Sequence, residues 1–242
     1  MENKSFHVAA FLLAVGLILG GWFIGNGFVK SRMADRYVTV KGVSERDVEA
    51  DIGLWPIRFV STDDNLALAQ SKIKKSRDAI MDFLERYGIR VESVEVQKLE
   101  VNDALANQYV SGQIQSRYII TQTLMVRTKN PELFRKASQK IGELVDAGVI
   151  LPATYGPESG PIYLFTRLND IKPEMIVEAT ATARESALQF AKDSGSELGG
   201  IRRAYQGVFV IQPRNPAPGV MEESEFSKTV RVVSTVEYYL ED

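Results

Sequence analysis

The sequence contains no cysteine and only one histidine, His7. Without cysteine the chain has no disulfide, no thiolate nucleophile and no thiolate metal site. Because His7 lies in the apolar N-terminal segment, the rest of the chain has no imidazole for acid–base chemistry or metal ligation. Ser-His-Asp and Cys-His mechanisms are therefore excluded there. The sequence also lacks a glycine loop of the kind that cradles phosphates, so we predict no enzyme activity, no cofactor and no metal.

An excess of charge of either sign is also missing. The chain has 29 basic and 31 acidic residues, which gives a formal net charge of -2. This balance gives no electrostatic reason to expect binding to a phosphate backbone, so we predict no nucleic-acid partner. Hydrophobic residues make up 45% and charged residues 25% of the chain, which is typical of a folded globular protein.

The sequence does contain one long apolar run, from Phe6 to Ile24. Apart from His7, its 19 residues carry no titratable side chain. At about 1.5 Å per residue, a helix of this length crosses a hydrocarbon core of roughly 30 Å. We therefore predict that residues 1–30 form one N-terminal transmembrane helix, signal-like but uncleaved, with the lipid bilayer as a partner. A cleaved signal peptide is the alternative, although residues 25–27 imitate its cleavage site only faintly.

The charges beside this segment do not decide its orientation. Lys30, Arg32 and Arg36 follow the apolar run, whereas Lys4 precedes it. By the positive-inside rule this bias keeps the following domain in the cytoplasm, but a long domain can cross a membrane regardless of such a bias.

Glycines recur at a spacing of four within the apolar run. Gly16 and Gly20 form one such pair, and Gly21 and Gly25 form another. This small-xxx-small spacing lets helix backbones approach closely, so we predict that these glycines pack anchor helices of several copies together. The alternative is that glycine is simply common in membrane helices.

The remaining residues, 37–242, predict a single α+β domain with antiparallel or mixed sheets. The 3.6-residue apolar period indicates three main helices at about 62–88, 131–148 and 172–194. We expect the first of them to begin with Thr62 or Asp63 as N-cap and to end at Gly88. Alternation indicates strands at about 37–43, 48–60, 91–101, 117–128, 162–166, 201–212 and 228–240.

Two details of the strands follow from the same patterns. The first two strands read as a pair, with a bulge or an edge position at Pro56, because proline cannot donate to a ladder. Residues 64–128 and 174–240 each contain a long helix, a glycine stop, a strand, a polar insertion and a return strand. We interpret them as an internal duplication of a helix–β-hairpin unit within one composite domain.

Four stretches of the sequence are similar to those of a known family. They are residues 38–42 (VTVKG), 87–89 (YGI), 194–200 (SGSELGG) and the closing alternation of 230–240. With them the chain resembles the SIMPL-domain (YggE-like) family of bacterial envelope proteins. The resemblance implies a bacterial inner-membrane protein whose C-terminal domain lies in the periplasm or outside the cell. It also implies large homo-oligomers of ring-like or channel-like form and a link with stress tolerance, but no defined biochemical activity.

Four residues are candidates for an oligomer interface. Tyr109 and Met221 lie in the two polar insertions, where an exposed apolar residue is a contact candidate, although each can instead pack on the domain's own surface. Val233 and Tyr239 lie on the face of the last strand opposite the apolar set 230, 232, 236, 238 and 240. A strand that is apolar on both faces is usually buried between layers or between subunits.

Two functional hypotheses follow. The first is a membrane-anchored, self-assembling envelope protein whose partner is itself and whose copies join through long hairpins. The second is a periplasmic binding or regulatory module that presents a groove between the two repeated halves to a ligand or to an unknown partner protein.

Overall fold

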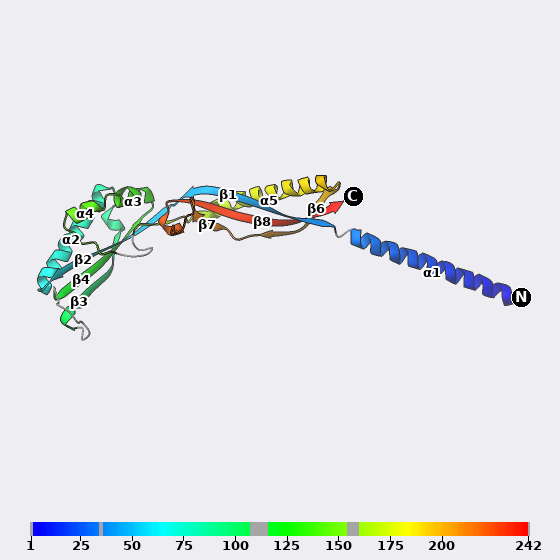
Figure 1. Ribbon diagram of the computed structural model, residues 1–242, viewed down its shortest axis with the longest axis horizontal. Helices are drawn as coiled ribbons and strands as arrows, with labels where there is room; N and C mark the ends of the chain where they lie inside the picture. Colours follow the sequence, from blue (N-terminus) through cyan, green and yellow to red (C-terminus); the bar gives the residue numbers. More distant parts are fainter. Residues whose placement is uncertain (1, 34–35, 107–115, 154–159, 242) are drawn as a thin grey trace. The chain divides into compact units, whose positions relative to one another are not determined.

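The computed structural model describes residues 2–33, 36–106, 116–153 and 160–241 (Figure 1). Its pairings are antiparallel and form two separate four-stranded sheets, so the predicted α+β class is confirmed. The helices are α1 (Glu2–Met33), α2 (Leu66–Arg86), α3 (Pro131–Ser138), α4 (Gly142–Asp146) and α5 (Leu168–Asp193). The strands are β1 (Tyr37–Glu49), β2 (Ile52–Asp63), β3 (Val94–Asp103), β4 (Tyr118–Thr128), β5 (Ile162–Leu164), β6 (Glu197–Gln206), β7 (Val210–Pro213) and β8 (Ser227–Glu241).

The chain divides into two compact units, each built from distant segments. The first unit contains Met1–Ser44, Glu174–Phe209 and Val232–Asp242, and the second contains Glu45–Pro173 and Val210–Arg231. One sheet has the order β1-β8-β6, with β7 also paired to β8, and the other has the order β3-β4-β2-β5.

The core of the first unit lies between α5 and one face of its sheet (Figure 1). The helix presents a stripe of alanines, and Val40, Val236 and Tyr238 of the strands pack against it. Gly42 of β1 lies so close to the helix that a Cβ there would be 1.8 Å from the carbonyl oxygen of Ala179. Small side chains on both elements therefore allow the helix backbone to touch the sheet. The buried alanines are Ala179, Ala183, Ala187 and Ala191.

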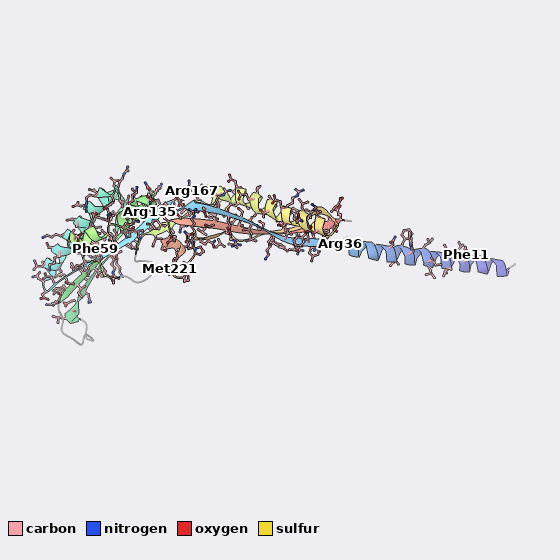
Figure 2. All side chains as sticks on the ribbon, turned by 45° about the horizontal axis from the view of Figure 1, so that its top comes forward. Phe11, Arg36, Phe59, Arg135, Arg167 and Met221 are labelled. Atoms are coloured by element: carbon pink, nitrogen blue, oxygen red, sulfur yellow. The ribbon has the colours of Figure 1, made fainter. Side chains whose placement is uncertain are left out.

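The core of the second unit is aromatic and lies under α2 and α3. Trp55 and Phe59 of β2 are almost fully buried, and Phe83 of α2 covers the same face. The rings of Trp55 and Phe134 pack edge to face with centroids 5.6 Å apart. Figure 2 labels Phe59 among these side chains.

Glycine ends three of the helices in the same way. Gly88, Gly148 and Gly195 have φ values of 78°, 82° and 69°, and each follows the C-cap of α2, α4 or α5. After α2, the N–H of Ile89 donates to the carbonyl of Leu84 and that of Gly88 donates to Glu85, which is the Schellman pattern. The predicted stop at Gly88 is therefore confirmed. The predicted N-cap is wrong, because Asn65 accepts from the N–H groups of residues 67 and 68.

The predicted pairing of the first two strands is wrong. β1 and β2 belong to different sheets, and the chain passes between these sheets at Ala50 and Asp51. Of the two expectations for Pro56, the bulge is absent from the described pairing of β2 with β4, whose register runs unbroken from Gly53 to Asp63. On its other side β2 pairs with β5 at residues 52–54 and next bridges Ile150 at Val60, so among the described strands Pro56 lies at the expected edge position.

Two of the predicted helices have different bounds. The helix expected over 131–148 is two short helices, α3 and α4, separated at Gln139–Ile141. Gly142 lies directly after this break, and the low helix propensity of glycine favours an interruption there. The last helix begins at Leu168, earlier than expected, and includes Pro173. In each unit a long helix covers an antiparallel sheet, but the internal duplication stays a prediction.

The predicted membrane anchor falls within α1, which is helical from Glu2 to Met33. Over the described residues, no helix combines the length and the apolar character that a membrane crossing requires. Anchoring therefore stays a prediction.

The contact at Gly42 gives a testable prediction. Replacing Gly42 with alanine would push α5 away from β1, because a Cβ cannot lie 1.8 Å from a backbone oxygen. We expect the variant to lower the free energy of unfolding by about 3 kcal/mol, measured by urea denaturation followed by circular dichroism. Gly200→Ala in β6 is the matched control, since nothing lies within 4 Å of its Cβ position. Equal stability of the two variants would contradict the close contact.

Candidate interaction surfaces

The sheet of the first unit is covered on one face only. Residues 232, 236 and 238 of β8 are buried on the side of α5. Successive side chains of a strand point to opposite faces, so residues 233, 235, 237, 239 and 241 point away from the helix. We call this second side of the sheet the open face.

Three tyrosines and two arginines lie on the open face. Tyr37 of β1, Tyr205 of β6 and Tyr239 of β8 are 45%, 53% and 37% exposed. The guanidinium carbon of Arg202 lies 4.0 Å from the ring centroid of Tyr37, and its Nη1 lies 3.5 Å from Oε2 of Glu237. Rigid aromatic rings that carry a polar end, together with arginine, are the side chains enriched at the centres of protein interfaces.

A bulge in β6 places two arginines on this face. The pairing with β8 shifts between Ile201 and Arg203, so Arg202 and Arg203 both lie opposite Glu237. The guanidinium of Arg203 then lies 5.7 Å from the ring centroid of Tyr205. Each arginine lies near an aromatic ring, which restricts the side-chain conformations that the arginine can adopt. Less conformational entropy is therefore lost when such a side chain binds a partner.

Two predicted interface residues lie on the open face. Val233 is half-buried, and Tyr239 is more exposed. The predicted separation of the two faces of the last strand is thus confirmed, while the role of these residues as an interface stays a prediction. Tyr37, Arg202, Arg203 and Tyr205 were not predicted. Alternation with Val38 and Val40 could have revealed Tyr37, but the bulge that turns the arginines has no signature in the apolar pattern.

The other two interface candidates are elsewhere. Tyr109 lies outside the described residues. Met221 belongs to the second unit and is 48% exposed, directly before a short 3-10 turn at Glu222–Ser224 (Figure 2). This turn is fixed by the fully buried Lys228, whose Nζ lies 2.5 Å from Oε1 of Glu222. The exposed Met221 therefore lies next to a turn whose position is fixed by an ion pair.

The described side chains of α1, those of residues 11–27, form a continuous apolar surface. Its large side chains are between 51% and 75% exposed, and Figure 2 shows Phe11 among them. Nothing lies within 4 Å of a Cβ placed at Gly16, Gly20, Gly21 or Gly25, so the monomer does not use these glycines for packing. The exposed apolar side chains are Phe11, Leu12, Leu13, Leu17, Ile18, Leu19, Trp22, Phe23 and Ile24.

The residues that carried the family resemblance are structural. Gly42 contacts α5, Gly88 and Gly195 end helices, and Ile89 is buried. The Tyr87 hydroxyl donates to Oε1 of Glu143 at 2.6 Å, and this bond raises the pKa of the phenol above its usual value. The described residues also contain no cluster of three or more carboxylate or imidazole groups able to hold a metal ion.

One ion pair joins the end of β3 to the start of β4 in the second unit. Arg117 donates from Nε and Nη2 to the two carboxylate oxygens of Asp103, at 3.2 and 3.1 Å. Its backbone N–H donates to Asp64, just before α2. The hydrogen bonds from Arg117 favour the ionised carboxylate and lower the pKa of Asp103 below its usual value of 3.8. We call these contacts of Arg117 with Asp103 and Asp64 the clasp, and they join the β3–β4 hairpin to the start of α2.

Comparison with known proteins gives one family match. The model of the SIMPL family, described as a protein of unknown function (DUF541), matches residues 38–238. No curated protein matches the chain.

The clasp gives a prediction on pH. A lowered pKa of Asp103 means that its stabilisation is present above about pH 3.8 and is lost as the pH falls through the lower value of the folded state. Asp103→Asn should therefore melt below the wild type at neutral pH, and the two melting temperatures should converge in strong acid. Asp78→Asn is the control, because Asp78 is 67% exposed and contacts Arg77 only at 3.4 Å. A constant difference across the pH range would contradict this role of Asp103.

Proposed function

We propose a function for this chain, which belongs to the SIMPL family of proteins of unknown function (DUF541). It is a membrane-anchored envelope protein that assembles with copies of itself. In this proposal the open face and the edges of the first unit's sheet join neighbouring copies, and the apolar α1 holds the assembly at a bilayer. The assembly is a large homo-oligomeric ring or channel-like particle in the cell envelope. The proposal assigns the protein no catalysis.

The exposed aromatic and arginine side chains of the open face carry the proposal. A half-covered sheet normally shows polar residues to water on its free side. This sheet instead shows three tyrosines and Val233 between its charged residues. Their burial against a second copy would remove apolar surface from water at roughly 25 cal/mol per Å², while the hydroxyl groups stay free to find polar partners.

The edges of the same sheet support a ring. In the order β1-β8-β6, the two outer strands are β1 and β6, and among the described strands neither has a further strand beside its outer side. Pairing of one copy's β1 with the next copy's β6 would use two different surfaces. Such head-to-tail contacts give closed rings when the rotation between copies closes.

The surface of α1 supports the anchor. A helix that is apolar all round is stable when lipid or other apolar helices surround it. The exposed side chains from Phe11 to Ile24 meet this description. No other described segment comes within 4 Å of a Cβ placed at Gly16, Gly20, Gly21 or Gly25, so this side of α1 can bring anchor helices of several copies together.

The proposed side of the membrane rests on the family resemblance and on the missing cysteines. We place the anchor in the bacterial inner membrane and the folded domain in the periplasm or outside the cell. The charges after α1 favour the opposite orientation, but such a bias does not prevent a long domain from crossing. The link with stress tolerance also stays a prediction from the resemblance.

The assembly can be tested on the open face itself. We expect Val233→Lys combined with Tyr239→Lys to reduce the particle mass in uncharged-lipid nanodiscs, because two unpaired charges would be desolvated at the interface. The matched control is Val177→Lys combined with Phe190→Lys on α5, where both residues are also exposed. Mass photometry and far-ultraviolet circular dichroism measure particle size and folding. The proposal would be contradicted if the open-face variant kept the particle mass of the wild type. It would also be contradicted if the wild-type protein itself had the mass of a monomer.

The location can be tested with a single cysteine, since the chain has none of its own. Ser224 is exposed in the second unit, so Ser224→Cys should react with a membrane-impermeant thiol reagent in intact cells. Asn3→Cys, on the other side of the apolar run, should react only after the membrane is permeabilised. The reverse pattern would place the domain in the cytoplasm.

A further inference from the structure

A groove in the second unit lies between α2 and the β3–β4 hairpin. Its volume is about 420 Å³, within the range of roughly 300–1,000 Å³ that is typical of small-molecule sites. The helix packs chiefly on β2 and β4, so the outer strand β3 is left beside it. The apolar lining consists of Leu66, Ile73, Leu99, Val101 and Ile120.

A bulge in β3 makes the floor of the groove apolar. The register with β4 shifts between Val96 and Lys98, so Leu99 lies opposite Gln122 and Val101 opposite Ile120. Without the extra residue, the charged residues Lys98 and Glu100 would take these places. The sequence shows the same shift, because its apolar residues fall at 94 and 96 and then at 99 and 101.

This floor is exposed in the monomer. Leu99 is 57% and Val101 is 54% exposed, and Leu66 at the start of α2 is 45% exposed. The deeper residues Ile73 and Ile120 are 4% and 2% exposed, so they are already part of the core. A ligand in the groove would therefore cover the outer apolar residues without displacing the core.

The rim of the groove is cationic. Lys74 and Arg77 of α2 line it, together with Gln70 and Gln122, and none of the lining residues is acidic. Lys74 makes no hydrogen bond or ion pair with another residue in the described part of the chain. The Nη2 of Arg77 lies 3.4 Å from its chain neighbour Asp78, and the side chain of Asp78 is 67% exposed.

Two other hollows of the second unit contain ion pairs. The hollow on the opposite side of the hairpin contains both Lys98 and Glu100, whose charged atoms are 2.8 Å apart. Another contains Arg135 and Glu132, which also pair with each other. Each of these two hollows thus has acidic residues in its lining, whereas the groove beside α2 combines an apolar floor with cations that no carboxylate of its lining compensates.

We propose that this groove binds a free, single-chain anionic amphiphile, such as a fatty acid. Its acyl chain would lie over Leu99 and Val101, and its carboxylate would face Lys74 and Arg77. The volume suits one chain, and the rim matches one negative head group. The inference is independent of the proposed assembly, because it concerns a surface of the second unit alone.

The site can be mapped on the full chain in nanodiscs of uncharged lipid, with a photoactivatable diazirine analogue of myristate as the probe. We expect the label on tryptic peptides from α2 and β3. Unlabelled laurate should compete, and octanoate should compete far more weakly, since each buried methylene raises affinity about fourfold. Dodecyltrimethylammonium has the same chain length as laurate but a positive head, so it should not compete.

Two pairs of variants separate the floor from the rim. Leu99→Gln combined with Val101→Gln should reduce groove labelling about tenfold, because the apolar floor is lost. Val96→Gln is its control, since Val96 is on the same face of β3 and is also 57% exposed but does not line the groove.

Lys74→Glu combined with Arg77→Glu should reduce labelling about tenfold through charge repulsion. Lys75→Glu is its control, because Lys75 lies outside this groove on the same helix.

Three results would overturn the proposal. Label confined to α1 would show only partition into the bilayer. Equal competition by the cationic and anionic amphiphiles on the wild-type protein would rule out the role of the rim, whatever the folding of the variants. Groove labelling from diazirine-tagged phosphatidylglycerol in the nanodisc, but not from the free acid, would identify a bilayer lipid as the ligand instead.

Discussion

The contact of α5 with Gly42 is the constraint on which the first unit depends. The alanine stripe and the missing Cβ let the helix lie directly on β1, and this contact fixes which face of the sheet is closed. Because side chains alternate along a strand, closing one face decides the orientation of every residue of β1 and β8 within the unit. The tyrosines of the open face are exposed as a consequence of that choice.

The residues of the described chain that stand out form structural contacts and exposed surfaces. The residues that resemble the family are glycines of helix ends and close contacts, together with buried positions such as Ile89. Tyr87 and Asp103 have shifted pKa values, but the largest cause of each shift is a hydrogen bond with a structural partner, Glu143 or Arg117. These partners hold helices and the hairpin in place. The exposed aromatic, apolar and cationic side chains of the open face and of the groove beside α2 suit contact with other molecules.

Bulges create both of the surfaces on which the proposals rest. In β6 a bulge brings Arg202 and Arg203 opposite Glu237, and in β3 another bulge turns Leu99 and Val101 toward α2. An extra residue in one strand reverses the facing of all residues that follow it. A single insertion is therefore enough to exchange a charged floor for an apolar one, as it does in the groove beside α2.

The sequence by itself determined much of this protein: its α+β class, its family, most strands, the glycine that ends α2, and the two faces of β8. These depend on short-range patterns of apolar spacing and turn residues, which a single chain shows directly. The tertiary structure alone decided that β1 and β2 enter different sheets, because Ala50 and Asp51 bond to Phe226 and Leu164, far along the chain. It also decided which residues share the open face and the groove. Both surfaces combine distant segments, and strand pairing that sets their register depends on contacts that local sequence does not encode.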